Sequence, residues 1–100
     1  MIMLNFLKEF NFTDEDINNI INSNDLNIIK NIELMKKNVK DVINYLYDIG
    51  VEDIKNIFEK RIDLFILPIK LLKQNFTKID NKMLVYILNN SISDLINYNI

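Results

Sequence analysis

The stretch of sequence that decides the fold reads Val39-Lys-Asp-Val42-Ile43-Asn-Tyr-Leu46-Tyr-Asp-Ile49-Gly50. Its apolar residues recur at the three- and four-residue spacing of an amphipathic α-helix. Gly50 follows the last of them and is the residue type best suited to the left-handed conformation that ends a helix. Residues 39–49 therefore predict a helix that ends at the only glycine in the chain.

Upstream of this helix, three further helices are predicted. Met3–Phe10 carries apolar residues at helical spacing, and Thr13 is a hydroxyl N-cap that precedes three acidic residues. Because the helix dipole favours negative charge in a first turn, a second helix should begin near residue 14. Asp25 is a suitable N-cap for the third.

Downstream, the chain predicts three more helices and a short terminal turn. Glu52–Lys60 has the apolar spacing of a short helix. Pro68 has no amide hydrogen to donate, so a helix should begin near it and not pass through it. Asp80 begins the last substantial helix, and Ser93 and Asp94 begin the terminal turn.

A count of six to eight short helices agrees with the composition of the chain. The sequence has 100 residues, of which 49% are hydrophobic, and this is enough for a core without disulfides or metals. One Gly and one Pro leave almost nothing to punctuate strands and hairpins. We therefore predict an all-α protein in which residues 1–100 form a single helical domain.

One apolar pattern occurs three times along the chain, at offsets of 37 and then 30 residues. Its positions are Ile17, Ile20, Ile21, Ile28 and Ile29, then Ile54, Ile57, Phe58, Phe65 and Ile66, then Leu84, Ile87, Leu88, Leu95 and Ile96. Repeats of this length are typical of helical hairpins that bury their faces against one another. We expect the helices to stack as helical hairpin repeats, as a short α-solenoid or as an irregular bundle.

The segment Ile43–Phe65 contains a predicted helix that ends at Gly50, then a short helix, then the turn Ile62-Asp63-Leu64-Phe65. This order resembles the repeat of the mitochondrial transcription termination factor (mTERF) family, although Ile62 stands where the turn of the family has proline. The resemblance implies a helical solenoid that binds nucleic acid along a concave face.

The residue types that most catalytic and metal sites need are missing. The sequence has no His and no Cys, which removes serine and cysteine triads, imidazole bases and zinc sites. A glycine-rich phosphate loop needs more than one glycine. The acidic runs Asp14–Asp16 and Glu52–Asp53 stand where a first helical turn favours negative charge. We therefore predict a protein that is not an enzyme, with no catalytic residue, no cofactor and no metal site.

Basic residues are concentrated in the middle of the chain. Residues 35–82 carry ten bases and seven acids, whereas residues 1–34 carry two lysines and six acids. In a stacked solenoid, residues at equivalent repeat positions lie side by side, and lysines there would neutralise several phosphates of a nucleic acid. The candidate nucleic-acid-binding residues are Lys36, Lys37, Lys40, Lys70 and Lys73.

Two tyrosines are the candidate contacts for a protein partner. Tyr45 and Tyr47 flank Leu46 on the predicted helix and cannot both point inward with it, so at least one should be exposed. Exposed tyrosines are typical anchors of protein interfaces. The apolar segment Met1–Phe12 is a further candidate contact, for association with a second copy of the chain.

These features predict a non-enzymatic helical binding module, a small adaptor or inhibitor that acts by protein–protein interaction on another protein or on its own copy. The alternative is an mTERF-like protein that binds nucleic acid. The N-terminus lacks a basic leader, and no apolar stretch approaches the roughly 20 residues that span a bilayer. Because no cysteine requires an oxidising compartment, we expect a cytoplasmic protein without a membrane partner.

Overall fold

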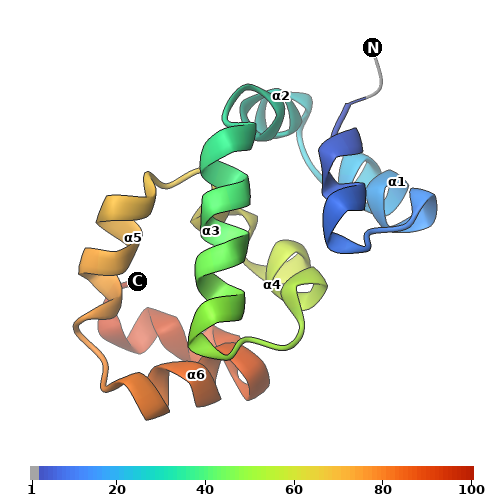
Figure 1. The fold of residues 1–100 in the computed structure, drawn as a ribbon. Coiled ribbons are helices and arrows are strands. Elements are labelled where there is room, and N and C mark those ends of the chain that lie inside the picture. Colours follow the sequence, from blue (N-terminus) through green and yellow to red (C-terminus); the bar gives the residue numbers. More distant parts are fainter. Residues whose placement is uncertain (1–2) are drawn as a thin grey trace.

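The computed structural model describes residues 3–100 and is all-α, as the sequence predicts (Figure 1). In that range the chain forms six α-helices, three 3-10 helices and no strand. None of these helices is long and apolar enough to cross a membrane. The α-helices are α1 Asp14–Ser23, α2 Leu26–Leu34, α3 Lys36–Ile49, α4 Ile54–Lys60, α5 Ile69–Phe76 and α6 Asn81–Asn90. The 3-10 helices are η1 Asn5–Phe10, η2 Ile62–Phe65 and η3 Ile92–Tyr98.

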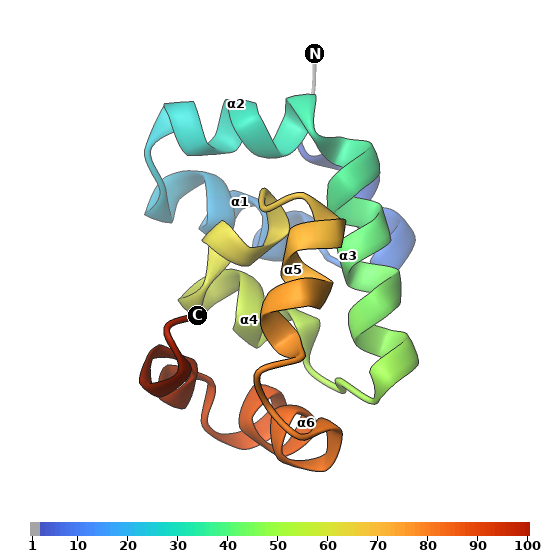
Figure 2. The same ribbon diagram turned by 90° about the vertical axis from the view of Figure 1, so that its left-hand side faces the viewer.

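Helix α3 runs through the middle of a molecule that measures 41 × 22 × 22 Å (Figure 1). Helix α5 packs along one flank of α3, whereas η1, α1 and α4 lie on the other. Helix α2 lies across one end of the molecule, and α6 and η3 lie at the opposite end (Figure 2). This arrangement brings α1 against α4, although the two helices are far apart in the sequence.

Local capping explains where several helices begin and end. The Thr13 hydroxyl accepts a hydrogen bond from the Asp16 N–H at 3.1 Å, and the Asp16 carboxylate accepts one from the Thr13 N–H at 2.8 Å. This reciprocal capping box defines the start of α1. Gly50 ends α3 with a φ of 110°, which residues that carry a Cβ rarely adopt. Pro68 directly precedes α5, as predicted.

The N-terminal segment forms a tighter helix than the predicted amphipathic α-helix. Asn5–Phe10 is a 3-10 helix, and the residue before it, Leu4, has a left-handed φ of 64°. The Leu4 N–H donates a hydrogen bond to Glu33 Oε1 at 2.7 Å, which ties the segment to the end of α2. A contact with a distant helix therefore holds a backbone conformation that local sequence does not favour.

Part of the segment Met1–Phe12, which is predicted to contact a second copy of the chain, is buried within the chain itself. Leu4 and Leu7 are fully buried, and Phe12 is 3% exposed. Their side chains complete the core of the chain itself. Met3, Phe6 and Phe10 are only partly buried, so association with a second copy through them stays a prediction. Residues 1–2 of the predicted contact lie outside the described part of the chain.

The buried apolar side chains form one cluster that extends from Leu4 to Leu95. Three phenylalanine rings join its N-terminal and central parts. The Phe12 and Phe58 rings meet edge to face with centroids 5.4 Å apart, and the Phe58 and Phe65 rings stack at 3.9 Å. Such aromatic pairs add about 0.5–1.5 kcal/mol each beyond the burial of apolar area. These contacts connect the start of α1 with α4 and η2.

The three occurrences of the repeated apolar pattern lie on α1 and α2, on α4 and around η2, and on α6 and η3. The series α1, α2, α3 is followed by α4, η2, α5 and then by α6 and η3. Equivalent members of the first two series are neighbours, since α1 packs against α4 and α3 packs against α5. Most of the repeated apolar positions are buried, and Ile96, which is 72% exposed, is the clearest exception.

Candidate functional site

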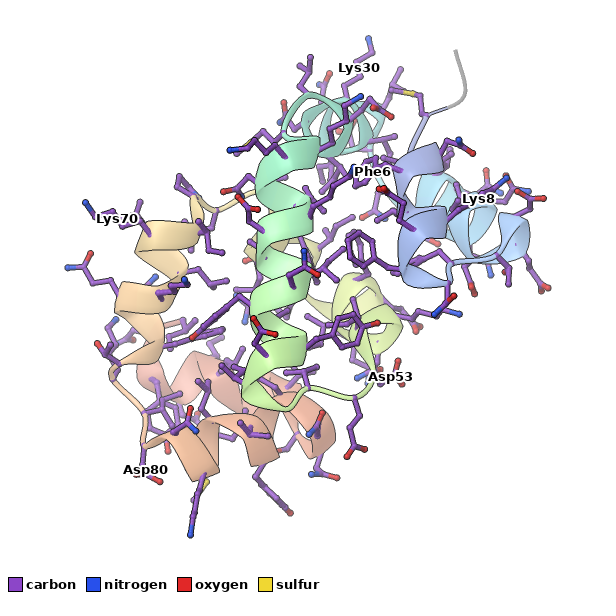
Figure 3. The ribbon with its side chains drawn as sticks, in the orientation of Figure 1. Phe6, Lys8, Lys30, Asp53, Lys70 and Asp80 are labelled. Carbon is purple, nitrogen blue, oxygen red and sulfur yellow. The ribbon has the colours of Figure 1, made fainter. Side chains whose placement is uncertain are left out.

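A cleft of about 540 Å³ lies between α1 and α4. This volume falls within the roughly 300–1,000 Å³ that is typical of ligand sites. The floor of the cleft consists of buried apolar side chains, which are Phe12, Ile20 and Phe58. The rim includes Asp16, Asn19, Asp53, Lys55, Asn56 and Glu59. Figure 3 shows Asp53 beside the start of α4, on the other side of α3 from Lys70.

An ion pair between Asp16 and Lys55 crosses the cleft. Asp16 Oδ2 lies 2.9 Å from Lys55 Nζ and also accepts the Thr13 N–H at 2.8 Å. The hydrogen bond from Lys55 is the largest cause that lowers the pKa of Asp16 from 3.8 to about 2, followed by the hydrogen bond from the Thr13 backbone. Lys55 Nζ also lies 5.7 Å from the centroid of the Phe12 ring. The cleft thus already holds one cation between a carboxylate and an aromatic face.

This pKa predicts a pH-dependent contribution of Asp16 to stability. Because the pKa of Asp16 is lower in the folded chain than its ordinary value of 3.8, its ionised carboxylate stabilises the fold above about pH 4. That contribution is lost as the pH falls through about 2. We expect Asp16→Asn to melt below the parent protein at neutral pH, and the difference between the two melting temperatures to shrink steadily below pH 4.

Thermal melts followed by circular dichroism at a series of pH values measure this difference. Glu15→Gln is the matched control, because Glu15 lies in the same first turn, is exposed and makes no ion pair among residues 3–100. If the difference in melting temperature between Asp16→Asn and the parent protein stays constant from pH 7 to pH 2.5, the role assigned to the Asp16 charge is contradicted.

The five lysines predicted to bind nucleic acid do not point to one common face. Lys40 Nζ lies 2.7 Å from Glu9 Oε2 and 5.9 Å from the centroid of the Phe6 ring, so Lys40 turns toward η1. Lys73 Nζ lies 5.1 Å from the centroid of the Tyr45 ring, which places it on the α5 flank of α3. The side chains of Lys40, from α3, and Lys73, from α5, therefore lie on opposite flanks of α3.

The remaining three lysines are exposed. Lys36 Nζ lies 3.9 Å from the Glu33 carboxylate, at the junction of α2 and α3. Lys37 and Lys70 make no ion pair among residues 3–100, and Lys70 projects away from the first turn of α5 (Figure 3). The structure thus leaves Lys37, Lys70 and Lys73 without an acidic partner among residues 3–100 and pairs Lys36 and Lys40 with acidic side chains.

The two candidate tyrosines have different surroundings, and the prediction that at least one is exposed is confirmed. Tyr47 is 42% exposed. Tyr45 is half-buried and stacks on Phe76 of α5, with ring centroids 6.3 Å apart. Burial raises the pKa of the Tyr45 hydroxyl. Tyr45 therefore serves the packing of α3 on α5, and Tyr47 is the one of the pair that is available to a partner.

Another exposed tyrosine, Tyr86, forms an apolar surface together with Met83, and both side chains are more exposed than Tyr47. Met83 is 48% exposed and Tyr86 is 60% exposed. Their spacing of three residues places them next to each other on the outer face of α6, and the opposite face of α6 is buried through Leu84, Ile87 and Leu88. The Met83–Tyr86 pair is thus an apolar surface that the fold itself does not use.

Sequence reasoning missed the cleft because it interpreted Asp14–Asp16 and Glu52–Asp53 only as the acidic starts of helices. The repeated apolar pattern was the signal that could have located it. At the 37-residue offset, Ile17 and Ile20 of α1 correspond to Ile54 and Ile57 of α4, and adjacent stacking of equivalent helices would have placed the two acidic runs close together.

Comparisons with known proteins assign no family to the chain. No family model, curated protein or solved structure matches it. The candidate sites are therefore defined by the contacts, burial and charges of residues 3–100.

Proposed function

We propose that this chain is a non-enzymatic helical binding module, an adaptor or inhibitor that acts by covering part of another protein. The observation that carries the proposal is the exposed Met83–Tyr86 pair on α6. Tyrosine buries a large apolar ring at low conformational cost and is enriched among the residues that dominate binding energy. The flexible thioether of methionine adapts to the shape of a partner surface.

Other exposed apolar side chains support the same proposal. Tyr47 is 42% exposed and Ile96 is 72% exposed, although a large buried core is already present. No polar or charged residue among residues 3–100 is buried, so the core contains no ionisable group. The proposal requires no cofactor and no metal. It assigns the protein to the cytoplasm, because a chain without cysteine has no need of an oxidising compartment.

A photo-crosslinking amino acid in place of Tyr86 tests this proposal. We expect the crosslinker at position 86 to capture one protein partner in cells, and purified partner to bind the parent chain. Met83→Ser combined with Tyr86→Ser should weaken that binding about 30-fold or more, because a buried hot-spot residue contributes at least about 2 kcal/mol.

The matched control for this experiment is Leu34→Ser, which also removes an exposed apolar side chain, at the opposite end of the molecule. It should leave the affinity unchanged. Equal weakening by Leu34→Ser, or a crosslinker at position 34 that captures the same protein as efficiently, would contradict the assignment of the surface to α6. A crosslinked species of twice the chain mass would identify the partner as a second copy of this chain.

Nucleic-acid binding is the second candidate function. It is favoured by the exposure of Lys37, Lys70 and Lys73, the last of which lies over Tyr45 where α3 packs on α5. The recurring order of helices and the stacking of α1 on α4 also support a helical repeat of the kind that the mTERF resemblance implies. Against it, Lys36 and Lys40 are paired with acidic side chains.

Fluorescence anisotropy of labelled DNA and RNA at two salt concentrations separates the two functions. Under the protein-binding proposal we expect flat titrations near physiological salt. Micromolar binding that weakens steeply with salt, and that is lost when Lys37, Lys70 and Lys73 are changed to Glu, would favour the second candidate.

A further inference from the structure

We propose that the cleft between α1 and α4 binds a Lys or Arg side chain from a basic segment of the protein partner. The inference rests on the proposed protein-binding function and adds the chemistry of the partner. It uses a different part of the molecule from the Met83–Tyr86 pair, because α1 and α4 lie beside α3 and α6 lies at one end (Figure 1). The two surfaces can therefore be tested separately.

The net negative charge of the cleft rim favours a positively charged side chain of the partner over a negatively charged one. Asp16, Asp53 and Glu59 contribute three carboxylates, and Lys55 is the only base among the lining residues. The Lys55 ammonium is engaged by Asp16 at 2.9 Å. Asp53 caps α4 by accepting the Asn56 N–H at 3.1 Å, but neither Asp53 nor Glu59 forms an ion pair among residues 3–100, so both carboxylates lack a countercharge. An anionic or purely apolar segment would meet unfavourable charge or polar groups that lose their water.

Lys55 displays the two contacts that an incoming side chain would make. Its ammonium lies 2.9 Å from a carboxylate oxygen of Asp16 and 5.7 Å from the centroid of the Phe12 ring. A carboxylate and an aromatic face each attract ammonium and guanidinium groups. The carboxylates of Asp53 and Glu59 offer a further cation an oppositely charged partner on the α4 side of the cleft.

The remaining lining residues suit a peptide side chain better than a bare ion. The buried Phe12, Ile20 and Phe58 provide an apolar floor for the methylene groups of Lys or Arg. Amide side chains at the rim, from Asn19 and Asn56, offer both donors and acceptors to a peptide backbone. In residues 3–100 no group of three or more acidic side chains is arranged to hold a metal ion, so the carboxylates of the rim do not converge as metal ligands do.

The test uses the full chain and a short fluorescein-labelled peptide of alternating Arg and Gly, with a peptide of alternating Glu and Gly as the control probe. At low salt we expect the Arg peptide to bind at least about tenfold more tightly than the Glu peptide. Asp53→Asn combined with Glu59→Gln should weaken binding of the Arg peptide about fivefold. Asn is itself a good helix cap, so this variant keeps the start of α4.

Two further variants distinguish the cleft from general attraction by negative charge. Lys55→Gln removes the competing ammonium and should tighten binding of the Arg peptide. Asp41→Asn combined with Asp48→Asn makes the same change in net charge as the rim variant, on exposed positions of α3, and should leave the affinity unchanged. Equal weakening by the α3 pair, or weaker binding by Lys55→Gln with its melting temperature preserved, would overturn the proposal.

The failure of this inference is distinguishable from the failure of the proposed function. If the partner captured at position 86 still binds but the rim variant has no effect on that partner or on the Arg peptide, the cleft proposal alone is overturned. If the Arg peptide binds through the rim and Met83→Ser with Tyr86→Ser leaves partner binding intact, the α6 surface is the part that fails. Two-dimensional NMR of the Asn19 and Asn56 side-chain amides reports peptide binding at the cleft directly.

Discussion

Replacement of Phe58 by alanine is expected to lower the free energy of unfolding by about 3–5 kcal/mol. Phe58 is 1% exposed, and its ring contacts Phe12 and Phe65 with centroids 5.4 and 3.9 Å away. Truncation leaves a cavity where the start of α1, α4 and η2 meet. Because a domain has only about 5–15 kcal/mol of stability, this loss should move the urea unfolding midpoint by a large fraction of its value.

Urea unfolding followed by far-ultraviolet circular dichroism measures this change. Phe10→Ala is the matched control, since it removes the same ring from a position that is only partly buried against the same core. We expect a clearly smaller loss for Phe10→Ala. Equal midpoints for the two variants would show that the contacts among the Phe12, Phe58 and Phe65 rings do not hold this junction together.

Replacement of Asn38 by alanine is expected to lower the free energy of unfolding by about 1.5–4.5 kcal/mol, the sum of three hydrogen bonds at about 0.5–1.5 kcal/mol each. The Asn38 amide donates to the Phe65 carbonyl at 3.2 Å and to the Leu67 carbonyl at 2.8 Å. Its Oδ1 accepts the Ile69 N–H at 3.0 Å. One side chain of α3 thus satisfies three backbone groups around the Pro68 break, where η2 ends and α5 begins.

Urea unfolding and amide hydrogen exchange at Ile69 test this role together. Asn44→Ala is the matched control, because Asn44 is exposed on the same helix and its side chain makes no hydrogen bond in residues 3–100. Alanine has the higher helix propensity, so the control should be neutral or slightly stabilising. If the Ile69 amide exchanges as slowly in Asn38→Ala as in the parent chain, Asn38 does not hold the start of α5.

Helix boundaries were predictable from single residues because capping acts within one turn. Thr13, Gly50 and Pro68 each mark a boundary through their own backbone or side-chain chemistry, and the structure places a helix end at each. The N-terminal segment was less predictable. The left-handed Leu4 and the 3-10 helix after it are held by Glu33, which is 29 residues away, and no local pattern reports such a contact.

The candidate sites were predictable only in part. Tyr45 and Tyr47 could not both be buried beside Leu46, but which one is exposed depends on Phe76 of α5, which covers Tyr45. The sequence placed the five candidate lysines on predicted helices. The direction in which each lysine side chain points, however, depends on its neighbours in the fold. Glu9, in η1, draws Lys40 away from the α5 flank.

The sequence by itself determined that the chain is helical, where most helices begin and end, and most of the repeated apolar positions that fill the core. These properties follow from helical periodicity and from capping, which act between residues a few positions apart. Only the tertiary structure decided that α1 meets α4 around a cleft, that Lys40 is paired, and that Met83 and Tyr86 stay exposed. The contacts responsible join residues far apart in the sequence, such as Asn38 and Ile69 at a separation of 31 residues, and depend on how whole helix faces fit together.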